Sequence, residues 1–341
     1  MSFRNLRSAA LAAAAAVLAG AAGAQEKVEL KFSHYAPPTH GFQKDLLEPW
    51  AAELEKRTGG KLTVRIFAAN SPFGNIANQA DQVKAGVTDA AWGLNGVPRG
   101  RFPRSLIMEL PYMASSSGAA SKTLWSMRGE LLAEEYKDFK VLTIHCHTQG
   151  GFFTRTKRIT DLEGLKSLRI RAPSLQVQNL LQHLGAVPVT MGPAQAYEAL
   201  EKGTIDGASL IYDGLVAFRL HGLVKYYLEA KIYTACFHVV MNPRKFESLP
   251  AEFRKAIDET SGQAWVDRVG ALWEKWDGAA RTAALEKGIE EIKVPDAVRA
   301  SWEQQLKPYI DKQLADMEGE GVKNARAIYE EMKKRVAQYA Q

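Results

Sequence analysis

The sequence predicts an α/β protein made of two βαβαβ lobes that face each other across a cleft. Short segments in which apolar and polar residues alternate are separated by segments with the apolar spacing of helices. The order strand, helix, strand, helix, strand occurs over residues 28–92 and again over residues 162–207. In both copies, at residues 84–89 and 201–206, a helix ends at glycine and an aspartate follows three residues later. We therefore expect two lobes of similar topology.

Residues 1–24 have the features of a signal peptide. Arg4 and Arg7 form a basic start, residues 9–20 are a short apolar run, and residues 22–24 are an A-x-A cleavage site. The mature protein is therefore expected to be exported. No later segment reaches the roughly 18 to 20 apolar residues that a membrane span needs, so we expect a soluble protein of the periplasm.

Length and composition narrow the class of protein. The chain has 341 residues, which is enough for two domains, and its 46% hydrophobic and 24% charged residues are typical of soluble globular proteins. The net charge of +6 becomes +4 without the two arginines of the predicted signal peptide. The remaining positive charge is dispersed among acidic residues, which argues against nucleic-acid binding but would help to attract an anion.

The first lobe is predicted from strand 28–33, whose residues alternate between apolar and polar. A loop leaves the end of this strand, and the helix that follows stops at Gly59 and Gly60. A strand at 62–66, a helix at about 75–85 and a strand at 87–92 complete the lobe.

The second lobe is predicted from a short strand that ends at Arg171. A helix at 175–184, a strand at 186–190, a helix at 194–202 and a strand that opens at Thr204 follow. The carboxyl ends of parallel strands meet at one crevice, which is the usual ligand site of open α/β folds. Because a guanidinium matches a carboxylate through two parallel hydrogen bonds, Arg171 predicts an anion-binding cleft. An ordinary surface or ion-paired arginine is the alternative.

Two further strands, at 141–146 and 232–241, are the places where the chain can cross between the lobes. Cys146 and Cys236 fall near these crossings, and the spacing leaves a disulfide and two free thiols equally open. From Pro250 the apolar spacing is helical beyond Trp276, which predicts one long helix. The mixed charges of the tail after residue 296 predict a solvated outer layer of helices.

Three motifs carry a family resemblance: GLKSLRIRAPS from residue 164, LGAVPV from residue 184 and AYEALEKGTIDG from residue 196. Together they resemble the signature of the substrate-binding proteins of TRAP transporters, the DctP type. The resemblance implies a periplasmic-binding-protein-like fold with a hinge and a long C-terminal helix that braces both lobes. It implies lobe boundaries of 25–147 plus about 236–275 for lobe I, and 148–235 plus about 276–341 for lobe II.

The same resemblance implies a function. Arg171 would clamp the carboxylate of an organic acid, and the receptor would deliver that acid to a permease with a small four-span and a large twelve-span membrane subunit, driven by an ion gradient. Membrane contact would occur only through the permease, and no cofactor is implied. A receptor that presents its ligand to a sensor protein, or a periplasmic enzyme acting on acids, is the alternative. No catalytic motif supplies an activated nucleophile, so we predict a receptor.

The sequence departs from sialic-acid receptors of this family, which have a second arginine about twenty residues before the first and an asparagine after the DG pair. Gly151 or Phe152 and Leu210 occupy those places here. The apolar residues Phe152, Phe153, Leu210 and Tyr212 favour a less hydroxylated ligand, an aromatic or branched monocarboxylate.

Other residues at predicted strand ends or on the crossing strand could line the cleft: His34, Tyr35, Trp92, Asn95, Tyr212, Asp213 and Phe237. Core packing is the alternative for the aromatic residues, and loop hydrogen bonding is the alternative for His34 and Asn95. Asp213 would repel a carboxylate unless it binds a hydroxyl, an ammonium or a cation, or caps a helix. His145 and His147 project to one side of a strand, but no third ligand is at a helpful spacing, so we predict no metal.

Overall fold

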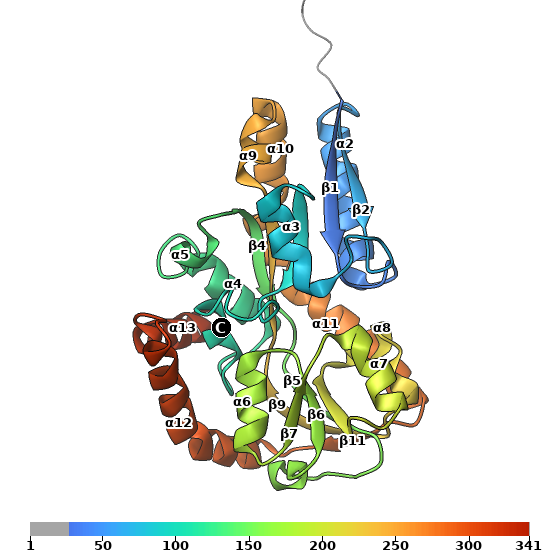
Figure 1. Cartoon of the computed structure of the whole chain (residues 1–341), viewed down its shortest axis with the longest axis vertical. Helices are drawn as coiled ribbons and strands as arrows, with labels where there is room; N and C mark the ends of the chain where they lie inside the picture. The colour runs from blue at the N-terminus through green and yellow to red at the C-terminus, as the bar shows by residue number, and fades with distance from the viewer. Residues whose placement is uncertain (1–26, 341) are drawn as a thin grey trace, which may run out of the picture.

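The computed structural model describes residues 27–340 and contains two β-sheets flanked by helices (Figure 1). The predicted signal peptide, residues 1–24, lies outside the described residues. Within residues 27–340, none of the helices combines the length and the apolar character needed to cross a membrane.

The first sheet has the strand order β2-β1-β3-β10-β4. Strand β1 pairs in parallel with β2 and β3, whereas β10 is antiparallel to β3 and β4. The predicted strand–helix alternation is present, although the first helix starts with a π-helical segment, η1 (Phe42–Leu47). The elements are β1 (Val28–His34), α2 (Glu48–Arg57), β2 (Leu62–Phe67), α3 (Gln79–Ala85), β3 (Ala90–Leu94), β4 (Lys140–Cys146) and β10 (Cys236–Met241).

The second sheet has the order β11-β9-β5-β8-β6-β7. Strand β6 pairs in parallel with β7 and β8, so the predicted βαβαβ order is confirmed in the second lobe. Strand β5 is antiparallel to β8 and β9. The elements are β5 (Gly150–Thr154), β6 (Arg169–Ala172), α6 (Leu175–His183), β7 (Val187–Thr190), α7 (Pro193–Glu201), β8 (Gly207–Leu210), α8 (Tyr212–Ala217), β9 (Tyr226–Tyr233) and β11 (Glu290–Lys293).

The chain crosses between the sheets at two adjacent places. The single strand predicted at 232–241 is in fact two strands, β9 in the second sheet and β10 in the first, separated by Thr234 and Ala235. The backbone N–H of His147, in the other crossing, donates to the carbonyl of Ala235 at 3.1 Å. Cys146 and Cys236 lie opposite each other in β4 and β10 and form a disulfide. The disulfide, one of the two alternatives left open by the sequence, therefore joins the two crossings on the side of the first sheet.

The long helix predicted after Pro250 is broken into α10 (Ala251–Thr260) and α11 (Gln263–Glu286). The break lies at Gly262, whose backbone angles of φ 59° and ψ −123° favour glycine because a Cβ atom is strained there. The N–H of Gly262 donates to the carbonyl of Leu142 in β4 at 2.7 Å, which compensates for the interrupted helix. Helix α11 then packs against α4 (Ser117–Met127) and β4 on the first sheet and against α8 on the second, so it braces both parts of the molecule (Figure 1).

The C-terminal helices are not merely a solvated layer. Helix α12 (Asp296–Gly319) buries Trp302 and Leu306, and α13 (Ala325–Tyr339) buries Ile328 and Met332. Helix α13 packs against α4 (Ser117–Met127), which itself covers β4 of the first sheet. The end of the tail thus packs against a helix that covers the first sheet. The short helices α5 (Ala133–Tyr136) and α9 (Pro243–Ser248) also lie beside the first sheet.

Candidate functional site

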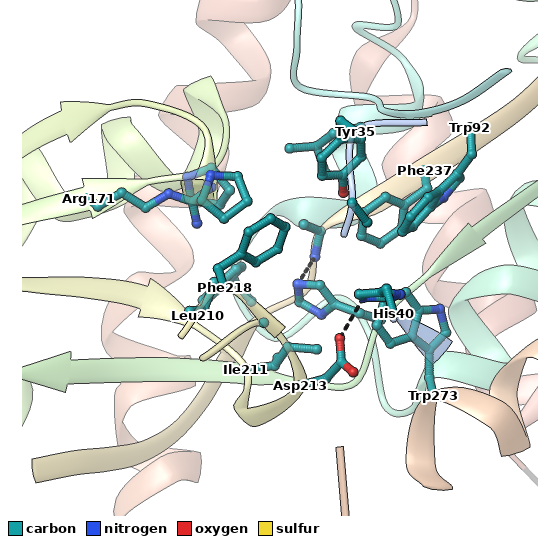
Figure 2. A pocket seen from close by; sticks show the side chains of 18 residues that line it. Tyr35, His40, Trp92, Arg171, Leu210, Ile211, Asp213, Phe218, Phe237 and Trp273 are labelled. Atoms are coloured by element: carbon teal, nitrogen blue, oxygen red, sulfur yellow. Dashed lines mark hydrogen bonds and ion pairs between the residues drawn. The ribbon is translucent and has the colours of Figure 1, made fainter. Parts of the chain in front are cut away.

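A pocket with about 500 Å³ of empty space lies between the two sheets (Figure 2). The pocket receives residues from both sheets, from the crossings and from α11. Six residues predicted from the sequence line it: Tyr35, Trp92, Arg171, Leu210, Asp213 and Phe237.

Arg171 is the buried cation of this pocket. It belongs to β6 and is 2% exposed. Its Nε donates to the carbonyl of Met191 at 2.9 Å, and its Nη1 donates to the carbonyl of Ser209 at 3.1 Å. These two bonds fix the plane of the guanidinium, while Nη2 makes no hydrogen bond with any residue between 27 and 340. The position at the carboxyl-terminal half of β6 agrees with the prediction from the strand pattern.

No carboxylate of the described chain forms an ion pair with Arg171. Burial lowers the pKa of this guanidinium, against the opposing influence of Tyr233 and Tyr35, but an arginine remains protonated at neutral pH. A buried charge without a partner of opposite sign is costly. The site therefore favours an anionic ligand, and the arrangement of the fixed guanidinium suits a carboxylate.

Aromatic rings form the wall of the pocket that belongs to the first sheet and to α11. Tyr35 stacks on Trp92 with 5.1 Å between the ring centroids and an interplanar angle of 26°. Phe237 stacks on Trp273 at 5.4 Å and 18°. Behind this wall, Phe42 stacks on Trp92 at 3.9 Å, which fixes the indole ring. Flat, rigid aromatic surfaces of this kind suit a planar apolar group.

A second polar group of the pocket joins the two sheets. His40, in the loop after β1, has its Nε2 atom 2.9 Å from Oδ2 of Asp213, which is in α8 (Figure 2). The N–H of Phe42 donates to Nδ1 of His40 at 3.0 Å, so the ring proton is on Nε2 and is donated to Asp213. The backbone N–H of Asp213 donates to Oδ1 of Asp277 at 2.8 Å. Burial, with a smaller contribution from the charge of Asp213, raises the pKa of Asp277 to about 6.

Two predicted residues lie behind the pocket wall and not in it. The Nε2 atom of His34 is 2.9 Å from Oε1 of Gln43, and burial lowers the pKa of His34 to about 4, so the ring is neutral at neutral pH. The side chain of Asn95 contacts the hydroxyl of Tyr136 at 3.3 Å and Nδ1 of His238 at 2.9 Å. The prediction that His34 and Asn95 line the cleft is therefore corrected, because their polar groups are used inside the first lobe.

Phe152, Phe153 and Tyr212 are core residues. Strand β5 lies between β8 and β9, and both Phe152 and Phe153 are 0% exposed. Phe153 stacks on Tyr227 at 4.2 Å between the ring centroids. The hydroxyl of Tyr212 donates to Oε2 of Glu291 at 2.8 Å, away from the pocket. Leu210, in contrast, does line the pocket, so the apolar character predicted there depends on Leu210 and not on these three rings.

Several pocket residues were missed by the sequence reasoning: His40, His147, Phe218, Tyr233 and Trp273. Tyr233 is the last residue of β9, but the sequence predicted one continuous strand at 232–241, so no strand end was expected at Tyr233. His40 lies in the loop predicted to follow β1, and this position was the only sequence feature that could have placed it in the pocket. Trp273 follows the apolar spacing of α11, and that spacing does not distinguish a core residue from a pocket residue.

His147 holds the crossing together through both of its ring nitrogens. Its Nε2 accepts the N–H of Ala235 at 3.2 Å, its Nδ1 contacts the carbonyl of Thr148, and burial lowers its pKa to about 4. His145, whose Nδ1 accepts the indole N–H of Trp273 at 3.0 Å, packs among aromatic rings. In residues 27–340, no group of three or more His, Cys, Asp or Glu residues is arranged to hold a metal ion.

The chain is similar to proteins of known structure and sequence. A TRAP solute-binding protein from Rhodoferax ferrireducens, solved with copurified benzoate, has a TM-score of 0.87 and 31% identity, over 92% of this chain and 99% of that one. A marine metagenome TRAP solute-binding protein specific for aromatic acid ligands, solved with 3-hydroxybenzoate, has a TM-score of 0.86 and 30% identity, over 93% of this chain and 100% of that one. The outer membrane transporter protein TsaT of Comamonas testosteroni is 25% identical, over 95% of this chain and 96% of the relative.

A family model described as bacterial extracellular solute-binding protein, family 7 (DctP), matches residues 32–316. The two similar structures are TRAP solute-binding proteins, so the predictions of fold class and of a receptor in place of an enzyme are confirmed. The chain therefore belongs to the DctP family, family 7 of the bacterial extracellular solute-binding proteins.

Proposed function

We propose that this protein is a periplasmic receptor that binds an aromatic monocarboxylate in the pocket between its two sheets and delivers it to a TRAP permease. The observation that carries the proposal is the buried guanidinium of Arg171, which has no acidic partner in the described chain and lines a pocket walled by aromatic rings. The carboxylate would bind the guanidinium, and the ring of the ligand would pack against the aromatic wall.

The shape and polarity of the pocket favour an aromatic acid over the branched acid that the sequence also predicted. Tyr35 stacks on Trp92 and Phe237 stacks on Trp273 within the wall, so the wall is rigid and aromatic, which suits a planar ring better than a branched alkyl chain. Leu210 and Ile211 contribute apolar surface from the second sheet. The two similar structures that contain benzoate and 3-hydroxybenzoate support the same choice of ligand class.

Closure of the lobes around the ligand is part of the proposal. The pocket takes residues from both sheets, so a ligand makes its full set of contacts only when the sheets are close together, and binding then favours the closed form. The two crossings beside the disulfide are short and adjacent, as a hinge requires. Lobe I would contain residues 25–147 and about 236–275, and lobe II would contain residues 148–235 and about 276–341, with α13 packed back against α4 of lobe I.

Periplasmic location and delivery to a permease rest on the sequence and the family. Residues 1–24 have the pattern of a signal peptide, and the chain belongs to an extracellular solute-binding family. The partner would be a TRAP permease with a small four-span and a large twelve-span subunit, which is the expectation from the family resemblance.

A thermal-shift screen followed by calorimetry tests the proposal. The mature protein is mixed with benzoate, with isovalerate as a branched acid, with succinate and with glucuronate. Benzoate should raise the melting temperature most, because a ligand that binds only the folded state stabilises it in proportion to ln(1 + [L]/Kd). Tight binding of succinate or glucuronate together with no response to benzoate would overturn the proposed ligand class.

A further inference from the structure

Asp213 has one carboxylate oxygen that the protein does not use. Its Oδ2 accepts from Nε2 of His40, whereas Oδ1 has no hydrogen-bond partner in the part of the chain that the structure describes. The side chain of Asp213 is 11% exposed and that of His40 is 4% exposed, and both residues line the pocket. Asp213 therefore lines the pocket with one carboxylate oxygen unpaired.

The contact with His40 fixes the orientation of this carboxylate. His40 accepts the N–H of Phe42 with Nδ1, so its only ring proton is the one that Asp213 already accepts. No Lys or Arg side chain within residues 27–340 is in salt-bridge distance of Asp213. The neighbouring Asp277 accepts a hydrogen bond from the backbone N–H of Asp213, and it donates none to the carboxylate of Asp213. Oδ1 is therefore an acceptor without a donor.

The pocket consequently has two polar ends of opposite sign. Arg171, from β6, offers unused donors, and Asp213, from α8, offers an unused acceptor, with the rings of Phe218 and Phe237 and the phenol of Tyr35 also lining the space (Figure 2). A ligand carboxylate is repelled by Asp213 and attracted by Arg171, so the electrostatics orient an aromatic acid with its far edge toward Asp213. A group at that edge meets an anionic acceptor.

We propose that Asp213, oriented by His40, accepts a hydrogen bond from a hydroxyl group on the ring of the aromatic acid, so that the preferred ligand is a hydroxylated aromatic carboxylate. This inference rests on the proposed function and assigns the specificity of the same pocket. A hydroxyl is favoured over an ammonium, because moving a full charge out of water into aromatic surroundings costs far more than moving a neutral donor.

The inference implies a selective loss for ligands without the donor. An acid that lacks the hydroxyl leaves Oδ1 buried and unpaired when the lobes close, and this loss should weaken binding by about 10- to 100-fold. A methoxy group in place of the hydroxyl fills similar space but brings a second acceptor against Asp213, so it should bind no better than the unsubstituted acid.

Calorimetric titration of benzoate, the three hydroxybenzoate isomers and the matching methoxybenzoates tests this directly. For the wild type, at least one hydroxybenzoate should bind about 10-fold or more tightly than both benzoate and its methoxy analogue. In Asp213→Asn, the amide oxygen remains the acceptor for Nε2 of His40, so the amide N–H groups face the pocket. The variant should then bind the methoxy analogue at least as tightly as the hydroxy acid, which reverses the preference. Asp206→Asn, at a carboxylate bound to Arg169 outside the pocket, should leave the wild-type ratio unchanged.

The two possible failures are distinct. If hydroxybenzoates and benzoate bind the wild type within about 3-fold of each other, or if Asp213→Asn weakens all ligands by one common factor, the hydroxyl proposal is overturned and the proposed function stands. In that case the His40–Asp213 contact serves lobe closure only. If none of the aromatic acids binds, the proposed function itself is wrong.

Discussion

Replacing Arg171 by methionine should remove most of the ligand affinity and leave the ligand-free protein folded. Methionine has a similar length and no charge, so it keeps the packing of β6 and removes the donors. In the complex, the ligand carboxylate would then be buried without a partner of opposite sign. Truncating one partner of a buried, hydrogen-bonded charge pair costs about 2–5 kcal/mol, which corresponds to a loss of about 30- to 5,000-fold in affinity.

The effect on stability should be small because two terms oppose each other. The substitution leaves the carbonyls of Met191 and Ser209 without their bonds from Arg171, at a cost of about 1–3 kcal/mol for each buried acceptor. It also removes a buried cation that has no acidic partner, which returns several kcal/mol. We expect the melting temperature of the ligand-free variant to stay within a few degrees of the wild-type value.

Calorimetry with benzoate on the wild type, Arg171→Met and Arg171→Lys measures the affinity, and differential scanning calorimetry measures the stability. The lysine variant keeps the charge but loses the planar fork of donors, so its affinity should still fall well below that of the wild type. Arg169→Met is the matched control, since Arg169 is in the same strand and bonds Asp206 outside the pocket. Wild-type affinity in Arg171→Met, or an equal loss in Arg169→Met, would refute the assigned role.

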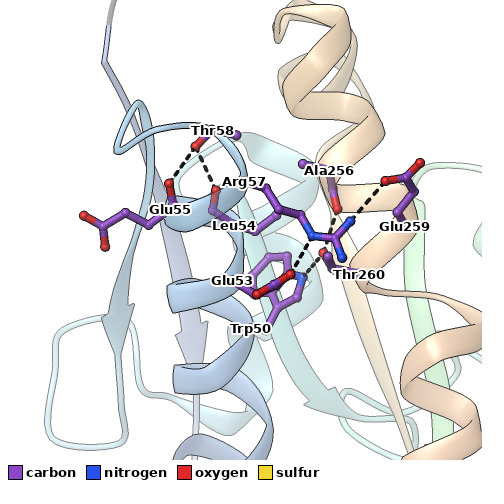
Figure 3. Close-up of polar contacts among 9 residues, drawn as sticks. All are labelled: Trp50, Glu53, Leu54, Glu55, Arg57, Thr58, Ala256, Glu259 and Thr260. Carbon is purple, nitrogen blue, oxygen red and sulfur yellow. Dashed lines mark hydrogen bonds and ion pairs between the residues drawn. The ribbon is translucent and has the colours of Figure 1, made fainter.

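Three further predictions concern stability. Thr260→Val should cost about 1–3 kcal/mol of unfolding free energy in urea, because the hydroxyl of Thr260 accepts the indole N–H of Trp50 at 2.9 Å (Figure 3). Glu259→Ala removes two exposed ion pairs, with Arg57 and Lys255, and should cost less than about 1 kcal/mol; equal costs for the two variants would contradict this reasoning. Cys146→Ser with Cys236→Ser should lower the unfolding free energy by about 3–5 kcal/mol, because the bond spans 90 residues, and an unchanged urea midpoint would argue against that account. The free energy of unfolding should fall by about 1 kcal/mol per pH unit from pH 6 to pH 5. Burial lowers the folded pKa values of four histidines to about 3 or 4, so in this range they take up protons only in the unfolded chain; three carboxyl groups, whose pKa values burial raises to about 6 or 7, hold protons only in the folded chain and offset part of this effect. A urea midpoint that does not change between pH 6 and pH 5 would contradict this prediction. These groups are His34, His145, His147, His238, Glu109, Glu135 and Asp277.

Local patterns in the sequence were enough for the parts of the fold that depend on local physics. The alternation in β1, the glycine after α3 and the βαβαβ order from β6 to β8 all follow from periodicity and from helix-ending glycines. Arg171 could be placed at the site because the carboxyl ends of parallel strands line one crevice, and Arg171 lies near such an end. The family motifs then gave the function class, which the match over residues 32–316 confirms.

The remaining features depend on contacts between distant segments. The division of residues 232–241 into two strands of different sheets arises from pairing with β5 on one side and β4 on the other, which an apolar run does not reveal. Phe152 and Phe153 were assigned to the cleft because the register of β5 in the middle of its sheet was unknown. His40 belongs to the first lobe and Asp213 to the second, so their contact depends on how the lobes are packed together and is not visible in any local sequence pattern.

A crystal structure of the mature protein with bound benzoate tests the central claim most directly. A carboxylate oxygen of benzoate should lie about 2.7–2.9 Å from Nη2 of Arg171, with the ring packed against the aromatic wall that contains Trp92 and Phe237. A structure in which the carboxylate binds elsewhere, with the guanidinium still bonded only to the carbonyls of Met191 and Ser209, would contradict the claim.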